Sequence, residues 1–142
     1  IPAESDIAAK WIINASSDLG FHLKGSTLYM LNKKSLDCFH SWSQVLKIRK
    51  SGVKMGDIIR GELIPDHELS MSPLLSENIP EIELQKNDAI RFLRRDDMAT
   101  TGTGSGWHIV RYHHQSLGWA KMVNGRVKNH YPIPWRILMN PF

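Results

Sequence analysis

A mixed α+β fold in two lobes, residues 1–56 and 57–142, is predicted by the sequence. Short amphipathic segments with helical spacing alternate with segments in which apolar residues recur at every second position. With 142 residues and 42% hydrophobic content, the chain can bury one core or two small ones without disulfides or a metal. The lobes are expected to meet near residues 52–65, and the second to be a curved, mostly antiparallel sheet or barrel with one or two helices.

The first lobe is expected to begin with a short helix and a hairpin. Ser5 or Asp6 can cap the helix, whose apolar residues recur at helical spacing until it ends near Asn14. Residues 20–31 then alternate between apolar and polar side chains on either side of a turn at residues 25–26, which predicts a hairpin.

Alternation also assigns faces to the expected strands of this lobe. In the hairpin, Phe21 and Leu23 are predicted to face the core, whereas His22 is predicted to face solvent. A further strand is predicted over residues 45–50, and an extended run over residues 57–63 follows it.

Two helices are predicted after the extended run. Pro65 ends that run and suits the first turn of a short helix over residues 66–71. Asn87 or Asp88 can cap a second helix that carries arginines on its outer face. The buried stripe of the second helix is expected to consist of Ala89, Ile90, Phe92 and Leu93.

The remainder of the second lobe is predicted to form strands. Residues 107–112 and 117–123 alternate in the manner of a pleated strand. The dipeptide Asn124-Gly125 accommodates the positive φ angles of a tight primed turn, so a hairpin is expected there. Two prolines then forbid regular pairing, and residues 135–139 are expected to add an edge strand.

Charge is segregated along the chain. Residues 57–97 are rich in Asp and Glu, whereas residues 98–142 contain neither. The acid-free stretch carries the cations Arg111, Lys121, Arg126, Lys128 and Arg136 and the aromatics Trp107, Tyr112, Trp119, Tyr131 and Trp135. Such a stretch attracts polyanions and offers rings on which bases can stack, which predicts a polarised surface that binds RNA.

The second hairpin holds the candidate RNA-binding surface. Lys121, Arg126 and Lys128 are spaced so that two flanking strands present them on one face, where they can follow a phosphate backbone. The candidate RNA-binding residues are Arg111, Trp119, Lys121, Asn124, Arg126, Lys128, Asn129, His130, Tyr131 and Arg136. The same pattern also fits a solvated sheet face above a core that includes Trp119.

Other motifs favour neither a catalytic nor a metal site. The glycine run 102–106 follows a helix and opens a strand, the reverse of the nucleotide-binding context, so a surface loop is favoured over a ligand loop. His108, His113 and His114 lack neighbouring Cys, Asp or Glu, which disfavours zinc. Cys38 is expected to pack in the core rather than act as a nucleophile. Whether the chain is part of an enzyme therefore stays open.

Composition indicates the cellular compartment in which the chain is expected to work. No apolar run reaches the roughly 20 residues that span a bilayer, and no secretory signal begins the chain, so a membrane partner is not expected. The one cysteine gives no sign of an oxidising compartment, which favours the cytoplasm. Because the chain begins without Met, we expect it to be a piece of a longer protein.

Several segments carry a family resemblance. They are Gly118 to Lys121, Asn124 to Pro132 and Trp135 to Ile137, with Gly52 to Gly56, Pro65 to Leu69 and Ala89 to Arg94 upstream. Together they resemble the C-terminal region of the Sun-family RNA cytosine-5 methyltransferases, in particular the RsmF-like group that acts on ribosomal RNA. Arg95 stands where that family frequently has glycine.

The resemblance implies a domain plan and a function. Residues 57–142 would be a PUA-like RNA-binding domain, forming a curved sheet or pseudo-barrel, and residues 1–56 a small connecting domain. Both would follow a separate Rossmann-like catalytic domain that holds S-adenosylmethionine, so this chain itself would bind no cofactor. It would be a non-catalytic module that anchors ribosomal RNA for methylation. The alternative is a structural domain that docks on its own catalytic domain.

Overall fold

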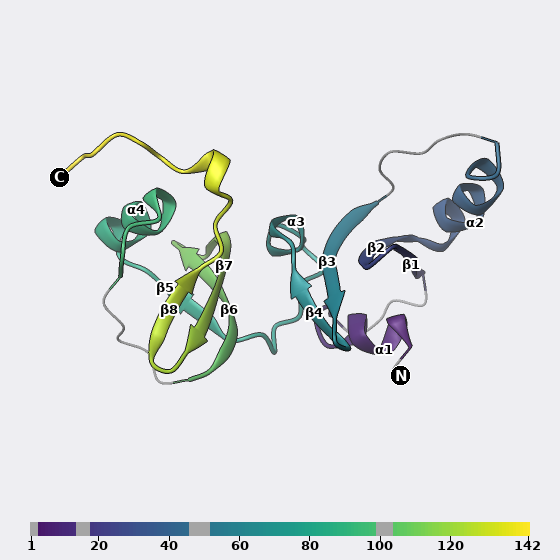
Figure 1. The fold of residues 1–142 in the computed structure, drawn as a ribbon, viewed down its shortest axis with the longest axis horizontal. Helices are drawn as coiled ribbons and strands as arrows, with labels where there is room; N and C mark the ends of the chain where they lie inside the picture. The colour runs from purple at the N-terminus through teal and green to yellow at the C-terminus, as the bar shows by residue number, and fades with distance from the viewer. Residues whose placement is uncertain (1–2, 14–17, 46–51, 99–103) are drawn as a thin grey trace. The chain divides into compact units, whose positions relative to one another are not determined.

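A computed structural model describes residues 3–13, 18–45, 52–98 and 104–142 (Figure 1). The chain divides into two compact units, Ile1–Glu77 and Asn78–Phe142, and each contains a four-stranded sheet. The predicted α+β class is thereby confirmed. None of the helices in the described ranges is long and apolar enough to cross a membrane.

The first unit is an antiparallel sheet with three helices. Its elements are α1 (Glu4–Ala9), β1 (Leu19–Lys24), β2 (Thr27–Asn32), α2 (Lys33–Trp42), β3 (Val53–Ile59), β4 (Glu62–Pro65) and α3 (His67–Ser70). The strands lie in the order β1-β2-β3-β4. The expected boundary between residues 56 and 57 falls inside β3, where Gly56 pairs with Leu28 of β2 and with Pro65 of β4. The two units instead divide after Glu77, because β3 and β4 complete the first sheet.

Several predicted elements of this unit are present with shifted ends. The hairpin of β1 and β2 is confirmed, with Lys24 paired to Thr27 across the turn. Helix α1 begins at Glu4, so Ser5 and Asp6 lie in its first turn rather than at its cap, and it ends at Ala9. The expected helix end near Asn14 lies outside the described residues, as does all of the expected strand over residues 45–50 except its first residue.

The two segments around Pro65 follow the prediction more closely. The extended run over residues 57–63 is a hairpin that turns at Arg60 and Gly61, which have φ angles of 53° and 80°. Helix α3 is confirmed, and the side chain of its N-cap Asp66 accepts a hydrogen bond of 3.0 Å from the backbone N–H of Glu68.

The predicted faces of β1 are wrong. His22 is 9% exposed, whereas Leu23 is 42% exposed. The histidine ring stacks on Tyr29 with 5.1 Å between centroids and lies 4.4 Å from the ring of Phe39 in α2. Alternation alone could not assign these faces, because α2 was not predicted and it covers the side of the sheet that holds the histidine.

Helix α2 also corrects the expectation for the cysteine. The Asn32 side chain caps the helix by accepting a hydrogen bond of 2.7 Å from the backbone N–H of Ser35. Leu36 packs against Gly20 of β1, where a β-carbon would lie 2.6 Å from the leucine side chain. Cys38 is exposed rather than buried in the core, because it lies on α2, which has no buried residues.

The second unit is a mixed sheet covered by one helix. Its elements are β5 (Glu81–Glu83), α4 (Lys86–Arg94), β6 (Gly106–Tyr112), β7 (Gln115–Val123), β8 (Arg126–Asn129) and the 3₁₀ turn η1 (Ile133–Trp135). The strand order is β5-β6-β7-β8, and only the β5–β6 pair is parallel. The predicted hairpin between β7 and β8 is confirmed, with φ angles of 50° at Asn124 and 74° at Gly125.

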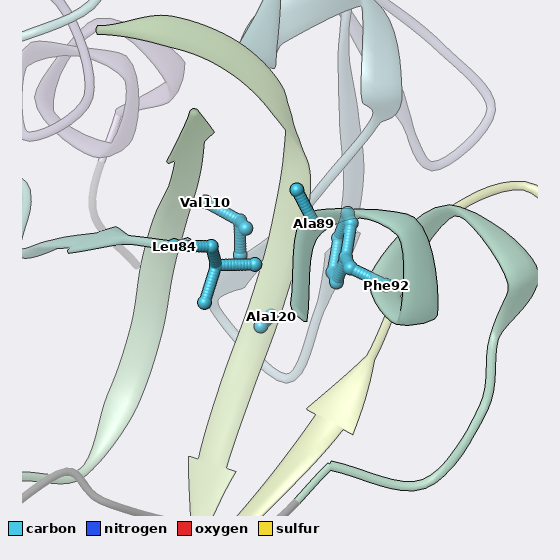
Figure 2. Close-up of a cluster of buried hydrophobic side chains, with 5 residues drawn as sticks. All are labelled: Leu84, Ala89, Phe92, Val110 and Ala120. Carbon is cyan, nitrogen blue, oxygen red and sulfur yellow. The ribbon is translucent and has the colours of Figure 1, made fainter. Parts of the chain in front are cut away.

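The core of this unit lies between α4 and the sheet. Figure 2 shows Ala89 and Phe92 of the helix beside Leu84, Val110 and Ala120. Phe92 and Ala120 are fully buried, so the small alanine on β7 leaves room for the phenylalanine ring. The predicted helix is confirmed, although only two members of its predicted stripe are fully buried.

The predicted edge strand over residues 135–139 is wrong. Ile133–Trp135 forms η1, with Pro134 in its first turn, and no strand pairing follows in the described chain. The segment instead runs along α4, because the backbone N–H of Ile137 donates to the carbonyl of Leu93 at 3.0 Å.

Candidate nucleic-acid interface

Three cations share one face of the β7–β8 hairpin. Lys121 is paired in register with Lys128, and Val123 with Arg126. Because side chains alternate along a strand, Lys121, Arg126 and Lys128 point to the same side of the sheet. Arg126 and Lys128 are exposed, and Lys121 is half-buried. The spacing argument from the sequence thus gave the correct face for these three residues, which are called the hairpin cations below.

Trp107 extends this face onto β6. It is the register partner of Lys121, whose Nζ atom lies 5.3 Å from the centroid of the indole ring. The contact holds the lysine ammonium over an aromatic face, an arrangement stabilised by the ring quadrupole. Trp107 was absent from the predicted site, although its strand alternation together with the β6–β7 register would have placed it there.

Trp119 is not available as a stacking platform. Its side chain is 1% exposed, and its ring meets that of Trp107 edge-on, with 6.4 Å between centroids and an interplanar angle of 82°. Its register partner Ile109 is equally buried. The prediction that the Trp119 ring contacts RNA is therefore corrected. The ring is buried, as the alternative interpretation of a core tryptophan predicted.

Asn129 ties the end of the hairpin to α4. Its Nδ2 atom donates to the carbonyl of Phe92 at 2.8 Å, and its Oδ1 atom accepts from the backbone N–H of Tyr131 at 2.8 Å. The Tyr131 ring lies 5.9 Å from the ring of Phe92. Both predicted contact residues thus have internal roles, and the Asn129 amide fixes the chain that leads out of β8.

Asn124, Arg111 and Arg136 lie outside this cluster. Asn124 is exposed and supplies the left-handed conformation of the hairpin turn. The Nε atom of Arg111 lies 3.0 Å from a carboxylate oxygen of Glu81, so this cation is already paired at the β5–β6 edge. Arg136 is exposed in the segment that follows η1.

His130 lies beneath the hairpin cations. Its backbone N–H donates to the carbonyl of Trp119 at 3.0 Å, and its ring lies 4.5 Å from that of Trp107. Burial lowers the pKa of His130, and the positive charges of Lys128, Arg95 and Lys121 lower that pKa further. The ring is therefore neutral at pH 7, and its Nε2 atom is buried without a hydrogen-bond partner among the described residues.

Arg95 adds a cation that the sequence did not predict for this surface. It follows α4 in the left-handed conformation, with φ of 61°, and its backbone N–H donates to the carbonyl of Phe92 at 3.0 Å. This backbone geometry explains why glycine suits the position. The guanidinium donates to the carbonyl of Tyr131, which brings its charge beside His130.

Within the described residues, the remaining motifs are not brought together into a second cluster. Residues 102 and 103 of the glycine run lie outside the described residues, and the rest of the run leads into β6. His108 is 8% exposed, and its Nδ1 atom lies 3.0 Å from the carbonyl of Gly106. Among the described residues, no group of three or more His, Cys, Asp or Glu side chains is placed to hold a metal ion.

Comparison with known proteins gives matches that include the second unit. Residues 79–137, almost all of the second unit, match the family model described as the PUA domain of the methyltransferase RsmF. Ribosomal RNA small subunit methyltransferase F of Shewanella woodyi is 33% identical over 89 residues, which are 61% of this chain. The match covers 18% of that relative, so the chain corresponds to less than a fifth of it.

The second unit thus matches the PUA domain of RsmF-like methyltransferases, as the sequence resemblance implied.

Proposed function

We propose that this chain is the non-catalytic RNA-binding end of a ribosomal RNA 5-methylcytosine methyltransferase. In this proposal it anchors ribosomal RNA so that a separate catalytic domain of the same protein, which binds S-adenosylmethionine, reaches its target cytosine. The reaction would be a step of ribosomal RNA processing in the cytoplasm. The observation that carries the proposal is the common face of Lys121, Arg126 and Lys128 within a PUA domain.

The physical role of this face is electrostatic anchoring. Each lysine or arginine that meets a phosphate releases condensed counterions, which makes binding favourable and dependent on salt. Residues 98–142 contain no Asp or Glu, so carboxylates from this stretch do not compete with RNA for the hairpin cations. The rigid β7–β8 register fixes the spacing of these charges and therefore positions the RNA as well as attracting it.

The test is a titration of ribosomal RNA fragments at several salt concentrations. Replacing Lys128 by Ala removes one phosphate contact, so affinity is expected to fall and the slope of log K against log salt to flatten by about one unit. Lys86→Ala is the matched control, because Lys86 is an exposed lysine of the same unit at the start of α4. An identical slope for wild type and Lys128→Ala would contradict the proposal.

A second candidate function is docking on the catalytic domain of the same protein. The segment after β8 leaves several large apolar side chains exposed: Ile133, Trp135, Leu138, Met139 and Phe142. It is anchored to α4, because the Arg94 guanidinium donates to the carbonyls of Leu138 and Met139 and lies in an ion pair of 2.8 Å with Asp96. An anchored apolar segment of this kind favours a protein partner.

One variant separates the two functions. Leu138→Ser is expected to weaken association with the catalytic domain, supplied as a separate polypeptide, while leaving the RNA titration of this chain unchanged. If the RNA affinity falls instead, the apolar segment belongs to the RNA-binding surface.

A further inference from the structure

We propose that a cavity between α4 and the sheet of the second unit receives a large apolar side chain of a protein partner, and that a lysine or arginine beside that side chain pairs with Asp97 at the mouth. The partner is assigned to the catalytic domain of the same protein. The inference rests on docking, the second candidate function above, and names the site and the chemistry that docking uses. RNA anchoring by the hairpin cations does not require it.

The cavity has room for a side chain from outside. Its volume is about 360 Å³, and most of its lining is apolar, including Ile82, Phe92, Met98, Val110, Met122 and Val127. A dry apolar cavity of about 150 Å³ already accepts benzene, so this one accommodates an aromatic or large aliphatic group. Two of the lining residues are methionines, whose flexible side chains adapt to the shape of what enters.

The cavity lies on the face of the sheet away from the hairpin cations. Met122 of β7 pairs with Val127 of β8, and each is next in sequence to a hairpin lysine. Because side chains alternate along a strand, this pair points to the side of the sheet opposite the lysines. Phe92 of α4 packs with Ala120 on the cavity side (Figure 2). The second unit can therefore hold RNA on one face and a protein on the other at the same time.

The mouth of the cavity carries an unmatched negative charge. The charged residues that line it are Asp88, Arg91 and Asp97. The Nη1 atom of Arg91 lies 3.0 Å from a carboxylate oxygen of Asp88, so these two charges are matched. Asp97 is exposed, and it forms no ion pair with any cation among the described residues. Its carboxylate attracts a cation and repels phosphate, which favours a basic protein segment over RNA as the occupant.

Exposed apolar surface continues from the mouth onto the C-terminal segment. The guanidinium carbon of Arg91 lies 5.1 Å from the centroid of the Phe142 ring. Leu138 and Met139, which are 76% and 73% exposed, are held on the same helix by Arg94. A pocket beside an exposed apolar strip is typical of protein interfaces, in which an anchor side chain fills the pocket and weaker contacts surround it.

The catalytic domain is the partner that this small interface suits. In the methyltransferase of Shewanella woodyi, the matched stretch is 18% of the chain, so the remainder offers a much larger surface. A domain on the same polypeptide docks at a high effective concentration, since the linker replaces free diffusion. One apolar anchor and one ion pair are then enough to hold two domains together, whereas a free partner needs a larger interface.

The experiment uses the whole 142-residue chain with its methionine methyl groups labelled for NMR. The catalytic domain is added as a separate polypeptide, and its affinity is measured in parallel by calorimetry at low and high salt. The methyl resonances of Met98 and Met122 are expected to shift, because both side chains line the cavity. The resonance of Met55, which is fully buried in the first unit, should stay in place.

Two variants test the cavity and its charge separately. Val127→Phe fills the cavity from β8 and should weaken association by at least about tenfold, the loss typical of a central anchor. Asp97→Asn keeps the size of the side chain and removes its charge. It should weaken association by about two- to fivefold at low salt and reduce the dependence on salt. Should Val127→Phe fail to fold, the methyl shifts and Asp97→Asn still decide.

Glu83→Gln is the matched control. Glu83 is an exposed acid of the same unit, and alternation along β5 points it away from the cavity that Ile82 lines. The glutamine keeps an oxygen that accepts from the backbone N–H of His114. Its affinity for the catalytic domain and its salt dependence should equal those of wild type.

The outcomes separate this inference from the functions proposed above. If the catalytic domain associates while the Met98 and Met122 methyl groups do not shift and both variants bind as wild type does, the cavity is overturned and docking stands. If a ribosomal RNA fragment shifts these methyl groups and the catalytic domain does not, the cavity belongs to the RNA-binding surface and the inference is overturned. If no association occurs, docking and the inference both fall, whereas RNA anchoring is decided by its own salt titration.

Discussion

Lys54 of the first unit and the hairpin lysines Lys121 and Lys128 of the second use their charge in opposite ways, although each unit is built on a four-stranded sheet. In the first unit, the Nζ atom of Lys54 lies 3.2 Å from a carboxylate oxygen of Asp66. Burial lowers the pKa of Lys54, but the combined effects of Asp66, Asp57 and Tyr29 outweigh burial, so the pKa is raised. In the second unit, Lys121 and Lys128 lie opposite each other, and their charges add to burial in lowering the pKa of His130. Cations matched by acids stabilise a fold, whereas cations gathered without acids are suited to an external anion.

Two histidines with lowered pKa values, His22 and His130, also differ in their surroundings. His22 of the first unit lies between the rings of Tyr29 and Phe39, and its pKa is lowered mainly by burial, with smaller contributions from His40 and Lys24. This ring is a packing element of its unit. His130 also has a lowered pKa, but it lies under cations that come from three elements of the fold.

The largest expected effect tests whether binding belongs to the second unit alone. Phe92→Ala removes a fully buried ring between α4 and the sheet and should destabilise the second unit by about 3–5 kcal/mol. Leu69→Ala should cost the first unit about 2–5 kcal/mol by the same mechanism. Denaturant unfolding measures both losses, and RNA titration of the same variants follows.

Only the variant in the second unit should lose RNA affinity. If Leu69→Ala weakens RNA binding as much as Phe92→Ala while the second unit stays folded, the first unit takes part in binding and the comparison between the units fails.

A smaller effect is expected from pH. Burial lowers the pKa of His22, His67 and His130 below the ordinary value of about 6.5, although the charge of Asp66 partly opposes the shift at His67. A lowered pKa in the folded state means that the unfolded chain binds more protons. Stability is therefore fully present above pH 6.5 and is lost as the pH falls through the folded values.

Two of these histidines lie in the first unit, so its unfolding midpoint should fall further between pH 7.5 and pH 5.5. Urea titrations followed by NMR signals of each unit measure the two midpoints. His22→Phe should reduce the acid sensitivity of the first unit, since phenylalanine keeps an aromatic ring between Tyr29 and Phe39 and does not titrate. An equal fall of both midpoints in wild type would contradict the proposed difference.

The sequence predicted the hairpin cations because two local rules sufficed. The Asn124-Gly125 turn fixes the register of its two strands, and strand alternation then fixes the shared face. Arg95 and Trp107 were missed because their positions depend on non-local contacts, namely the hydrogen bond from Arg95 to the Tyr131 carbonyl and the β6–β7 pairing. The burial of Trp119 was missed because alternation identifies the two faces of a strand but not which parts of each face are covered.

Local sequence patterns were also insufficient to predict α2 in the first unit and the boundary between the two units. The helix that contains Cys38 has neither Gly nor Pro to mark its ends, so its cap at Asn32 was not recognised. The boundary was placed at residue 56 because the family resemblance and the glycine-rich turn near residue 52 suggested it. The non-local pairing of β3 with β2, together with the hairpin of β3 and β4, assigns these strands to the first sheet.

The smallest expected effect comes from a lysine whose charge is already matched. Lys54→Ala removes a partly exposed ion pair with Asp66, and such pairs contribute about 0–1 kcal/mol to the free energy of unfolding. The Asp66 side chain still caps α3 through the backbone N–H of Glu68, so the fold should persist. Because Lys54 neutralises a carboxylate rather than a phosphate, the salt dependence of RNA binding should equal that of wild type. A flatter slope for Lys54→Ala, measured beside Lys128→Ala in one series, would show that the acid-matched Lys54 of the first unit also meets the RNA.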